Sequence, residues 1–280
     1  MTIASGSTTR LAVIKEATWG TTPTTPVWLV ARMTGESLNL TKQFITSNEI
    51  QSDRNVRDAI GVGKGAGGDI QIEWAYGGSG SALDAMLESV MWATWSTDVL
   101  KNGTSQQPLS IEKTFETGAT DVFCRMTGMV GNTLSLTASA RQILTGSIGF
   151  IGKGGSYDSA IVTGATYTAA PTGAVMDAAA NFASLSVTGL TSPKIRTVTL
   201  NATNNLREQA VVGSDELAGI GAGRFEVSGT MEVYLEDKAL LDLYFNSTAA
   251  DLTFTIGSVT TEKYTFSIPT LKFVSAEVVA

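Results

Sequence analysis

The chain has 280 residues, 19 Lys+Arg against 26 Asp+Glu, a formal net charge of −7, and no histidine. Without histidine, a Ser-His-Asp or Cys-His nucleophile system and imidazole ligation of a metal are excluded. The one cysteine, Cys124, excludes an intrachain disulfide and a cysteine-rich zinc site, and the sparse Lys and Arg argue against nucleic-acid binding through neutralised phosphates.

The composition and the hydrophobic periodicity both indicate a mainly β protein. Charged residues make up 16% of the chain and glycine contributes 29 residues, whereas an average soluble domain has about 25% charged residues. Branched side chains suit a pleated sheet and glycine suits turns, so this composition favours strands. In chain order, the periodicity predicts strands at 70–74 and 134–138, a possible strand at 185–187, and strands at 195–200, 230–235, 252–256 and 264–268.

Only two segments have apolar residues at helical spacing. The first begins at Ser81, which forms a capping-box pattern with Asp84 ahead of an apolar run that ends at Met91. The second follows Asp237, whose side chain is suited to cap a helix over 240–245. We therefore expect two helices in an otherwise β chain.

Elements of the first half recur in the second half in the same order, which indicates an internal duplication. Gly61–Gly65 matches Gly219–Gly223 at an offset of 158, and Gly68–Trp74 matches Gly229–Leu235 at an offset of 161. Three further matches are 38–40 with 198–200, 83–86 with 241–244, and 134–137 with 264–267.

The duplication predicts two similar β-sandwich or barrel domains, each with one packed helix. The first covers residues 1–152 and contains a long loop at about 45–67, and the second covers residues 193–280. A connector over 153–192, rich in small and polar residues, joins them.

The glycine-rich segment Gly61–Gly68 has the composition of a phosphate-binding loop but not its context. A phosphate loop needs Ser or Thr after the lysine and a helix after the loop, because backbone N–H groups at the helix start bind the phosphate. Here Lys64 is followed by Gly65, and the next predicted element is a strand. We interpret the segment as the end of a long loop with a bulge entering a strand.

Charged residues concentrate in 47–58, where three carboxylates (Glu49, Asp53 and Asp58) accompany Arg54 and Arg57. A glycosidase with paired carboxylates needs no histidine, so a hydrolase is an alternative. The mixed signs favour a solvated loop or an interface instead, and no run of alternating acidic residues indicates a calcium loop. We predict no catalytic, cofactor-binding or metal-ligating residue.

Three segments in the first third form a specific combination: Lys15–Pro26, Ser47–Asp58, and the glycine-rich exit Gly63–Gly68 leading into 69–74. In this combination the chain resembles the tail tube (major tail) proteins of long-tailed bacteriophages and prophages. The resemblance implies a structural protein without catalysis or cofactor, whose subunits form rings that stack into a hollow tube for genomic DNA.

The resemblance also implies a location and partners. The protein would belong to the virion tail, after synthesis and assembly in the host bacterial cytoplasm. Its partners would be other copies of itself, the tail tip or baseplate and tail terminator proteins, and a tape measure protein in the lumen, with DNA passing through without specific binding. A capsid decoration protein or an adhesin-like binding module is the alternative.

The long charged loop suits a contact with an adjacent subunit or ring, and the candidate residues are Glu49, Asp53, Arg54, Arg57, Asp58 and Lys64. The resemblance implies six-fold rings of single-domain subunits, so the duplication favours rings of three chains with pseudo-six-fold symmetry over rings of six. An acidic wall would repel DNA rather than retain it. No apolar run reaches the roughly 18 residues of a membrane span, and the first residues lack the pattern of a secretory signal.

Overall fold

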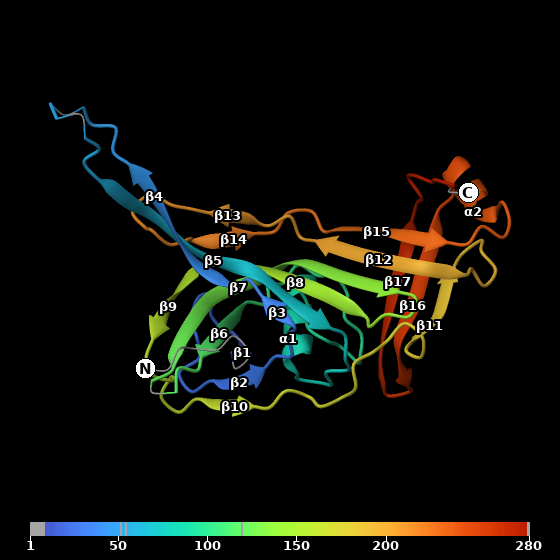
Figure 1. Ribbon diagram of the computed structural model, residues 1–280, viewed down its shortest axis with the longest axis horizontal. Coiled ribbons are helices and arrows are strands. Elements are labelled where there is room, and N and C mark those ends of the chain that lie inside the picture. Colours follow the sequence, from blue (N-terminus) through green and yellow to red (C-terminus); the bar gives the residue numbers. More distant parts are fainter. Residues whose placement is uncertain (1–8, 51, 54, 119, 279–280) are drawn as a thin grey trace.

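Strands account for most of the ordered elements, which confirms the mainly β prediction. The computed structural model describes residues 9–50, 52–53, 55–118 and 120–278 (Figure 1). The strands of the first half are β1 (Arg10–Lys15), β2 (Val27–Val30), β3 (Gly35–Glu36), β4 (Asn39–Thr46), β5 (Ala59–Glu73), β6 (Leu109–Phe115), β7 (Val122–Ser139) and β8 (Thr145–Gly152). Those of the second half are β9 (Gly154–Asp158), β10 (Thr166–Thr168), β11 (Phe182–Val187), β12 (Ile195–Thr203), β13 (Arg207–Gln209), β14 (Gly219–Gly221), β15 (Glu226–Val233), β16 (Ala250–Val259) and β17 (Glu262–Leu271). The helices are α1 (Ala82–Met91) and α2 (Ala239–Phe245).

The long strand β7 belongs to two layers of the largest sheet. Its first part pairs with β6 and β9, and its last part pairs with β8 and β12. One layer continues from β6 through β1 and β2 to β10, and the other continues from β8 through β5 to β3 and β4. Since one strand runs through both layers, it fixes their relative position.

Helix α1 begins where the capping-box pattern predicts it. The Ser81 hydroxyl accepts a hydrogen bond of 3.2 Å from the backbone N–H of Asp84, which satisfies one of the free donors of the first turn. The helix packs Met86, Leu87 and Val90 into a core that also contains Trp74 of the segment after β5. The predicted first helix is therefore confirmed, together with its cap.

The second helix lies close to its predicted position with a different first residue. Lys238 is the N-cap of α2 and makes no side-chain cap hydrogen bond, while the Asp237 carboxylate accepts a hydrogen bond of 2.7 Å from the N–H of Ala239. Only Leu243 of this helix is buried. The helix is short and covers little surface, so packing contributes less to it than to α1.

The strands β11, β16 and β17 form a separate three-stranded sheet that packs against the core of the first half. Phe266 of β17 makes an edge-on contact with the indole of Trp74, with ring centroids 5.6 Å apart, and stacks on Phe254 at 5.0 Å. The Tyr264 hydroxyl accepts a hydrogen bond from the N–H of Gly77. Both halves of the chain thus contribute side chains to one hydrophobic cluster.

The segment predicted as a long loop at about 45–67 is largely strand. β4 and β5 form an antiparallel hairpin with Thr46 opposite Ala59, so only 47–58 connect them. Glycine has a low strand propensity, but the ladder that β5 makes with β4 and β8 outweighs it. The connector 153–192 likewise contains β9, β10 and β11, of which β11 includes the possible strand at 185–187.

Part of the order of elements is common to the two halves. The paired strands β4 and β5 precede α1, β6 and β7. The paired strands β12 and β15, with β13 and β14 between them, precede α2, β16 and β17. The duplication and the division into domains at 1–152 and 193–280 remain predictions. The two halves share one hydrophobic cluster, so packing does not separate them into two cores.

Gly68 has a positive φ and little free space beside it, which supports a test of stability. Its φ is +135°, and a Cβ there would lie 2.5 Å from the carbonyl oxygen of Ser37. We expect Gly68→Ala to lower the free energy of unfolding by about 3 kcal/mol, measured by urea denaturation. Gly80→Ala is the control, because Gly80 has φ of +75° with open space around it, and should cost about 1 kcal/mol. Equal losses in the two variants would contradict the clash.

Candidate assembly surface

The hairpin of β4 and β5 projects beyond the rest of the molecule, at the upper left of Figure 1. We call its outer part, residues 42–64, the arm. Its ladder extends from Lys42 opposite Lys64 to Thr46 opposite Ala59, and the N–H of Ser47 donates to the carbonyl of Asp58 at 2.9 Å. The hydrogen-bonded part of the arm therefore ends at Ser47 and Asp58, and the loop between them forms the tip.

The glycines of β5 in the arm lie on both faces of the hairpin. Gly61 is opposite Phe44 and Gly63 is opposite Gln43, because the register shifts at Val62. A Cβ on Gly61 would lie 2.7 Å from the side chain of Lys42. The glycines therefore leave room for the side chains of β4.

Four of the predicted site residues lie on the loop at the tip of the arm, and all four are exposed: Glu49, Asp53, Arg57 and Asp58. Arg57 lies 3.6 Å from the Glu49 carboxylate. Hydrogen bonds from the side chain and backbone of Asn55 lower the pKa of Asp53, and Asp58 accepts a hydrogen bond from the N–H of Ala59. Arg54 lies outside the described residues.

Lys64 lies apart from the other candidates, at the base of the arm. Its ammonium is 2.7 Å from Asp215, which raises the pKa of the lysine, and its N–H donates to the Asp215 carbonyl. Asp215 belongs to the loop between β13 and β14, and the neighbouring Glu216 lies 3.2 Å from Lys153. The loop between β13 and β14 therefore supports the base of the arm within the same chain, a role that sequence spacing of 151 residues did not suggest.

The arm also exposes large apolar side chains that the sequence analysis did not single out. Ile50 at the tip is 96% exposed, and Phe44, Ile45, Val56 and Ile60 are exposed along the hairpin. Clustered exposed apolar side chains mark interaction surfaces in soluble proteins. The apolar pair Phe44-Ile45, set between charged and polar residues, was the available signal in the sequence.

The layer that contains the arm has two edges within the described chain. β4 pairs only with β5 on one side of this layer, and β15 pairs only with β12 on the other. Edge strands offer unpaired N–H and carbonyl groups to another chain. The arm and these two edges are the candidate assembly surface.

A comparison with protein-family models identifies the family of this chain. A family model described as phage tail tube protein matches residues 6–277. The chain belongs to the phage tail tube protein family. Tail tube proteins are structural components of the virion tail, so the predicted family and its structural role are confirmed. No curated protein matches the chain.

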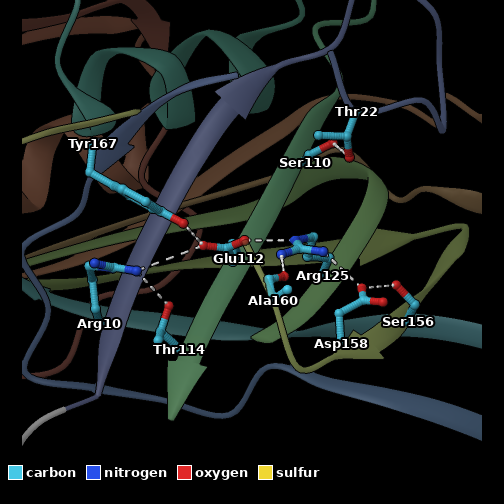
Figure 2. Close-up of polar contacts among 10 residues, drawn as sticks. All are labelled: Arg10, Thr22, Ser110, Glu112, Thr114, Arg125, Ser156, Asp158, Ala160 and Tyr167. Carbon is cyan, nitrogen blue, oxygen red and sulfur yellow. Dashed lines mark hydrogen bonds and ion pairs between the residues drawn. The ribbon is translucent and has the colours of Figure 1, made fainter. Parts of the chain in front are cut away.

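In this tail tube protein, the buried carboxylate Glu112 is the centre of an ionic network (Figure 2). Its side chain is 0% exposed and receives hydrogen bonds from Arg125 Nε at 2.7 Å and from the Tyr167 hydroxyl at 2.5 Å. Arg125 also lies 2.9 Å from Asp158, and Arg10 lies 4.0 Å from Glu112.

This network fastens the edge elements of the tail tube fold to its centre. Arg10 is on β1, Glu112 on β6, Arg125 on β7, and Asp158 on β9. Burial, followed by the hydrogen bond to Glu112, raises the pKa of Tyr167 of β10 to about 12, so its hydroxyl stays a donor at neutral pH. The network is a structural clamp rather than a catalytic group, because Arg125 binds both carboxylates.

The hydrolase alternative finds no support among the described residues of this tail tube protein. Burial raises the pKa of Asp84 to about 6, but the cavity beside α1, lined by Arg32, Tyr76 and Ser81, holds a single carboxylate, Glu73. Over the same residues no group of acidic or cysteine side chains is arranged for a metal ion. Neither α1 nor α2 is long and apolar enough to cross a membrane, and the described chain has no other helix.

Proposed function

We propose that this protein polymerises into stacked rings that form the phage tail tube, a conduit for DNA during ejection. The observation that carries the proposal is the arm, a hydrogen-bonded hairpin that extends past the body with apolar side chains exposed to solvent. A monomer gains nothing from exposing these side chains, whereas a neighbouring copy buries them. The tip residues Glu49, Asp53, Arg57 and Asp58, with Arg54, would form the charged rim of this contact.

Three chains per ring, with pseudo-six-fold symmetry, would follow from the predicted duplication, in which each chain supplies two similar sets of strands. We expect purified protein to form hollow tubes at high concentration and class averages of single rings to show three-fold symmetry. Electron microscopy of negatively stained protein, with native mass spectrometry of short assemblies, measures both. Rings of six chains would overturn the stoichiometry, and a protein that stays monomeric would overturn the assembly.

The net charge of −7 suits the passage of DNA. Excess carboxylates on the wall would repel phosphates and prevent binding that slows ejection. The tube would end at tail tip or baseplate and terminator proteins and enclose a tape measure protein, after synthesis in the host cytoplasm. A lumen lined mainly by Lys and Arg would contradict the electrostatic part of this proposal.

A further inference from the structure

The pairing of β7 with β12 shows how the second set of strands joins the first. Seven residues of β7, Thr133–Ser139, pair antiparallel with Thr197–Thr203 of β12. β12 is thereby held on both sides, by β7 and by β15. The end of one set of strands thus adds to the first strand of the next set.

The last strand of the second set continues into residues that pair with no described strand, although Phe273 among them packs against the cluster of Val187, Leu243 and Ala250. β17 pairs with β16 as the first part of β7 pairs with β6, with Ile268 opposite Leu252 and Met129 opposite Leu109. This strand pairing gives a different correspondence from the sequence match of 134–137 with 264–267. The chain continues past β17 as residues 272–278, which belong to no strand and pair with no strand of the described chain. Val274 in this segment is 87% exposed. The described part of the segment has enough residues to repeat the ladder that β7 makes with β12.

The strand that would receive it is β4. β4 corresponds to β12 in the order of elements, through the match of Leu40 with Leu200, but it pairs only with β5 among the described strands. From Thr41 to Thr46 its side chains are exposed. Its free edge therefore lacks the partner that β7 provides to β12.

The donor and the acceptor lie at opposite ends of the same molecule. In Figure 1 the arm and β4 are on the left, and β17 with α2 is on the right. A contact between two different surfaces of identical chains is heterologous and generates a ring or a helix.

We propose that residues 272–278 of one copy add to the free edge of β4 in a second copy as an antiparallel strand. This inference rests on the proposed ring assembly and names the strand that joins one chain to the next. In the ladder of β7 with β12, Ser135 lies opposite Asn201. The equivalent pair in the proposed contact is Val274 of one copy opposite Thr41 of the other. Backbone hydrogen bonds hold the contact, and alternate side chains determine its register.

Disulfide trapping tests the pairing in the full-length chain. Directly opposed residues of antiparallel strands have Cα atoms about 4.5–5.5 Å apart, which a disulfide can bridge. A chain carrying Thr41→Cys and Val274→Cys should, on mild oxidation under assembly conditions, give covalent multimers whose cross-linked peptides join positions 41 and 274. Non-reducing electrophoresis and mass spectrometry measure this. The two single variants control for Cys124, which is buried.

The competing occupant of the β4 edge is β15 of the second copy. A chain carrying Thr41→Cys and Val227→Cys tests it, because Val227 is an exposed residue of β15. We expect the yield of cross-linked multimers to be at least ten-fold higher for the 41/274 pair than for the 41/227 pair. The reverse result would overturn the inference, and so would normal rings from a chain shortened at Leu271.

The wild-type protein in the same preparation separates the two proposals. If the wild-type protein forms tubes but the double-cysteine variant gives no link between 41 and 274, the strand pairing is wrong and the proposed function stands. If the wild-type protein forms no tubes and the variant gives no cross-link, both proposals are wrong.

Discussion

Replacing the arm loop, residues 47–58, with Asn-Gly is expected to abolish tube formation and leave a folded monomer. Thr46 and Ala59 lie opposite each other at the end of the ladder, and a two-residue Asn-Gly turn fits such a pair. The replacement removes the exposed Ile50 and Val56 together with the charged tip. If these form the centre of an interface, its loss costs about 3–4 kcal/mol per contact and raises the critical concentration for assembly roughly 100- to 1000-fold.

Light scattering and electron microscopy measure assembly, and thermal denaturation shows whether the monomer is intact. Two narrower variants separate the contributions of the tip. Ile50→Asn removes the most exposed large apolar side chain of the arm, while Glu49→Gln with Arg57→Gln removes the ion pair. Val99→Asn is the control for an exposed apolar residue on the body. Tubes of normal length from the shortened arm would refute its role in polymerisation.

Arg125→Met is expected to destabilise the monomer more than any substitution in the arm. It leaves the Glu112 carboxylate buried without the guanidinium that neutralises it, with only Arg10 at 4.0 Å. Breaking a buried ion pair by removing one partner costs about 3–5 kcal/mol, which for a chain of this size lowers the melting temperature by roughly 5–9 °C. Denaturant unfolding of the unassembled protein measures the loss.

A double variant distinguishes the loss of the ion pair from the loss of packing. Glu112→Leu with Arg125→Met removes both charges, so no unpaired carboxylate remains in the interior. We expect this variant to recover most of the stability lost in Arg125→Met, because well-packed apolar residues often replace a buried pair at little cost. A double variant no more stable than the single one would show that the network matters for its packing and not for its charge.

Alternation in the sequence predicts the strands that have one buried face. Ile195–Thr203, Ala250–Val259 and Glu262–Leu271 are of this kind. β6 was missed because it is buried on both faces, so Ser110, Glu112 and Thr114 occupy the interior and break the apolar pattern. Glu112 can be buried because Arg125 neutralises it. Such a pairing depends on tertiary packing, and the periodicity of the sequence does not reveal it.

The charged tip of the candidate surface was predicted because charge and resemblance are visible in the sequence. The strand character of 59–67 was not, because it depends on ladders with β4 and β8 that outweigh the low strand propensity of glycine. The exposure of Phe44 and Ile60 was also missed, because apolar residues in a strand are usually buried. Lys64 was assigned to a contact between copies, and the structure pairs it with Asp215 within the chain.

The register shift at Val62 in the arm has a mechanical consequence. Val62 is left without a partner in the ladder and is flanked by Gly61 and Gly63, whose backbones are the least restricted, so the hairpin can bend at this point while the ladder on either side stays intact. If the arm links neighbouring copies, each link then acts as a compliant joint. We expect a tail built from such links to bend by many small rotations at the arms, with the sheets of each subunit moving as rigid blocks.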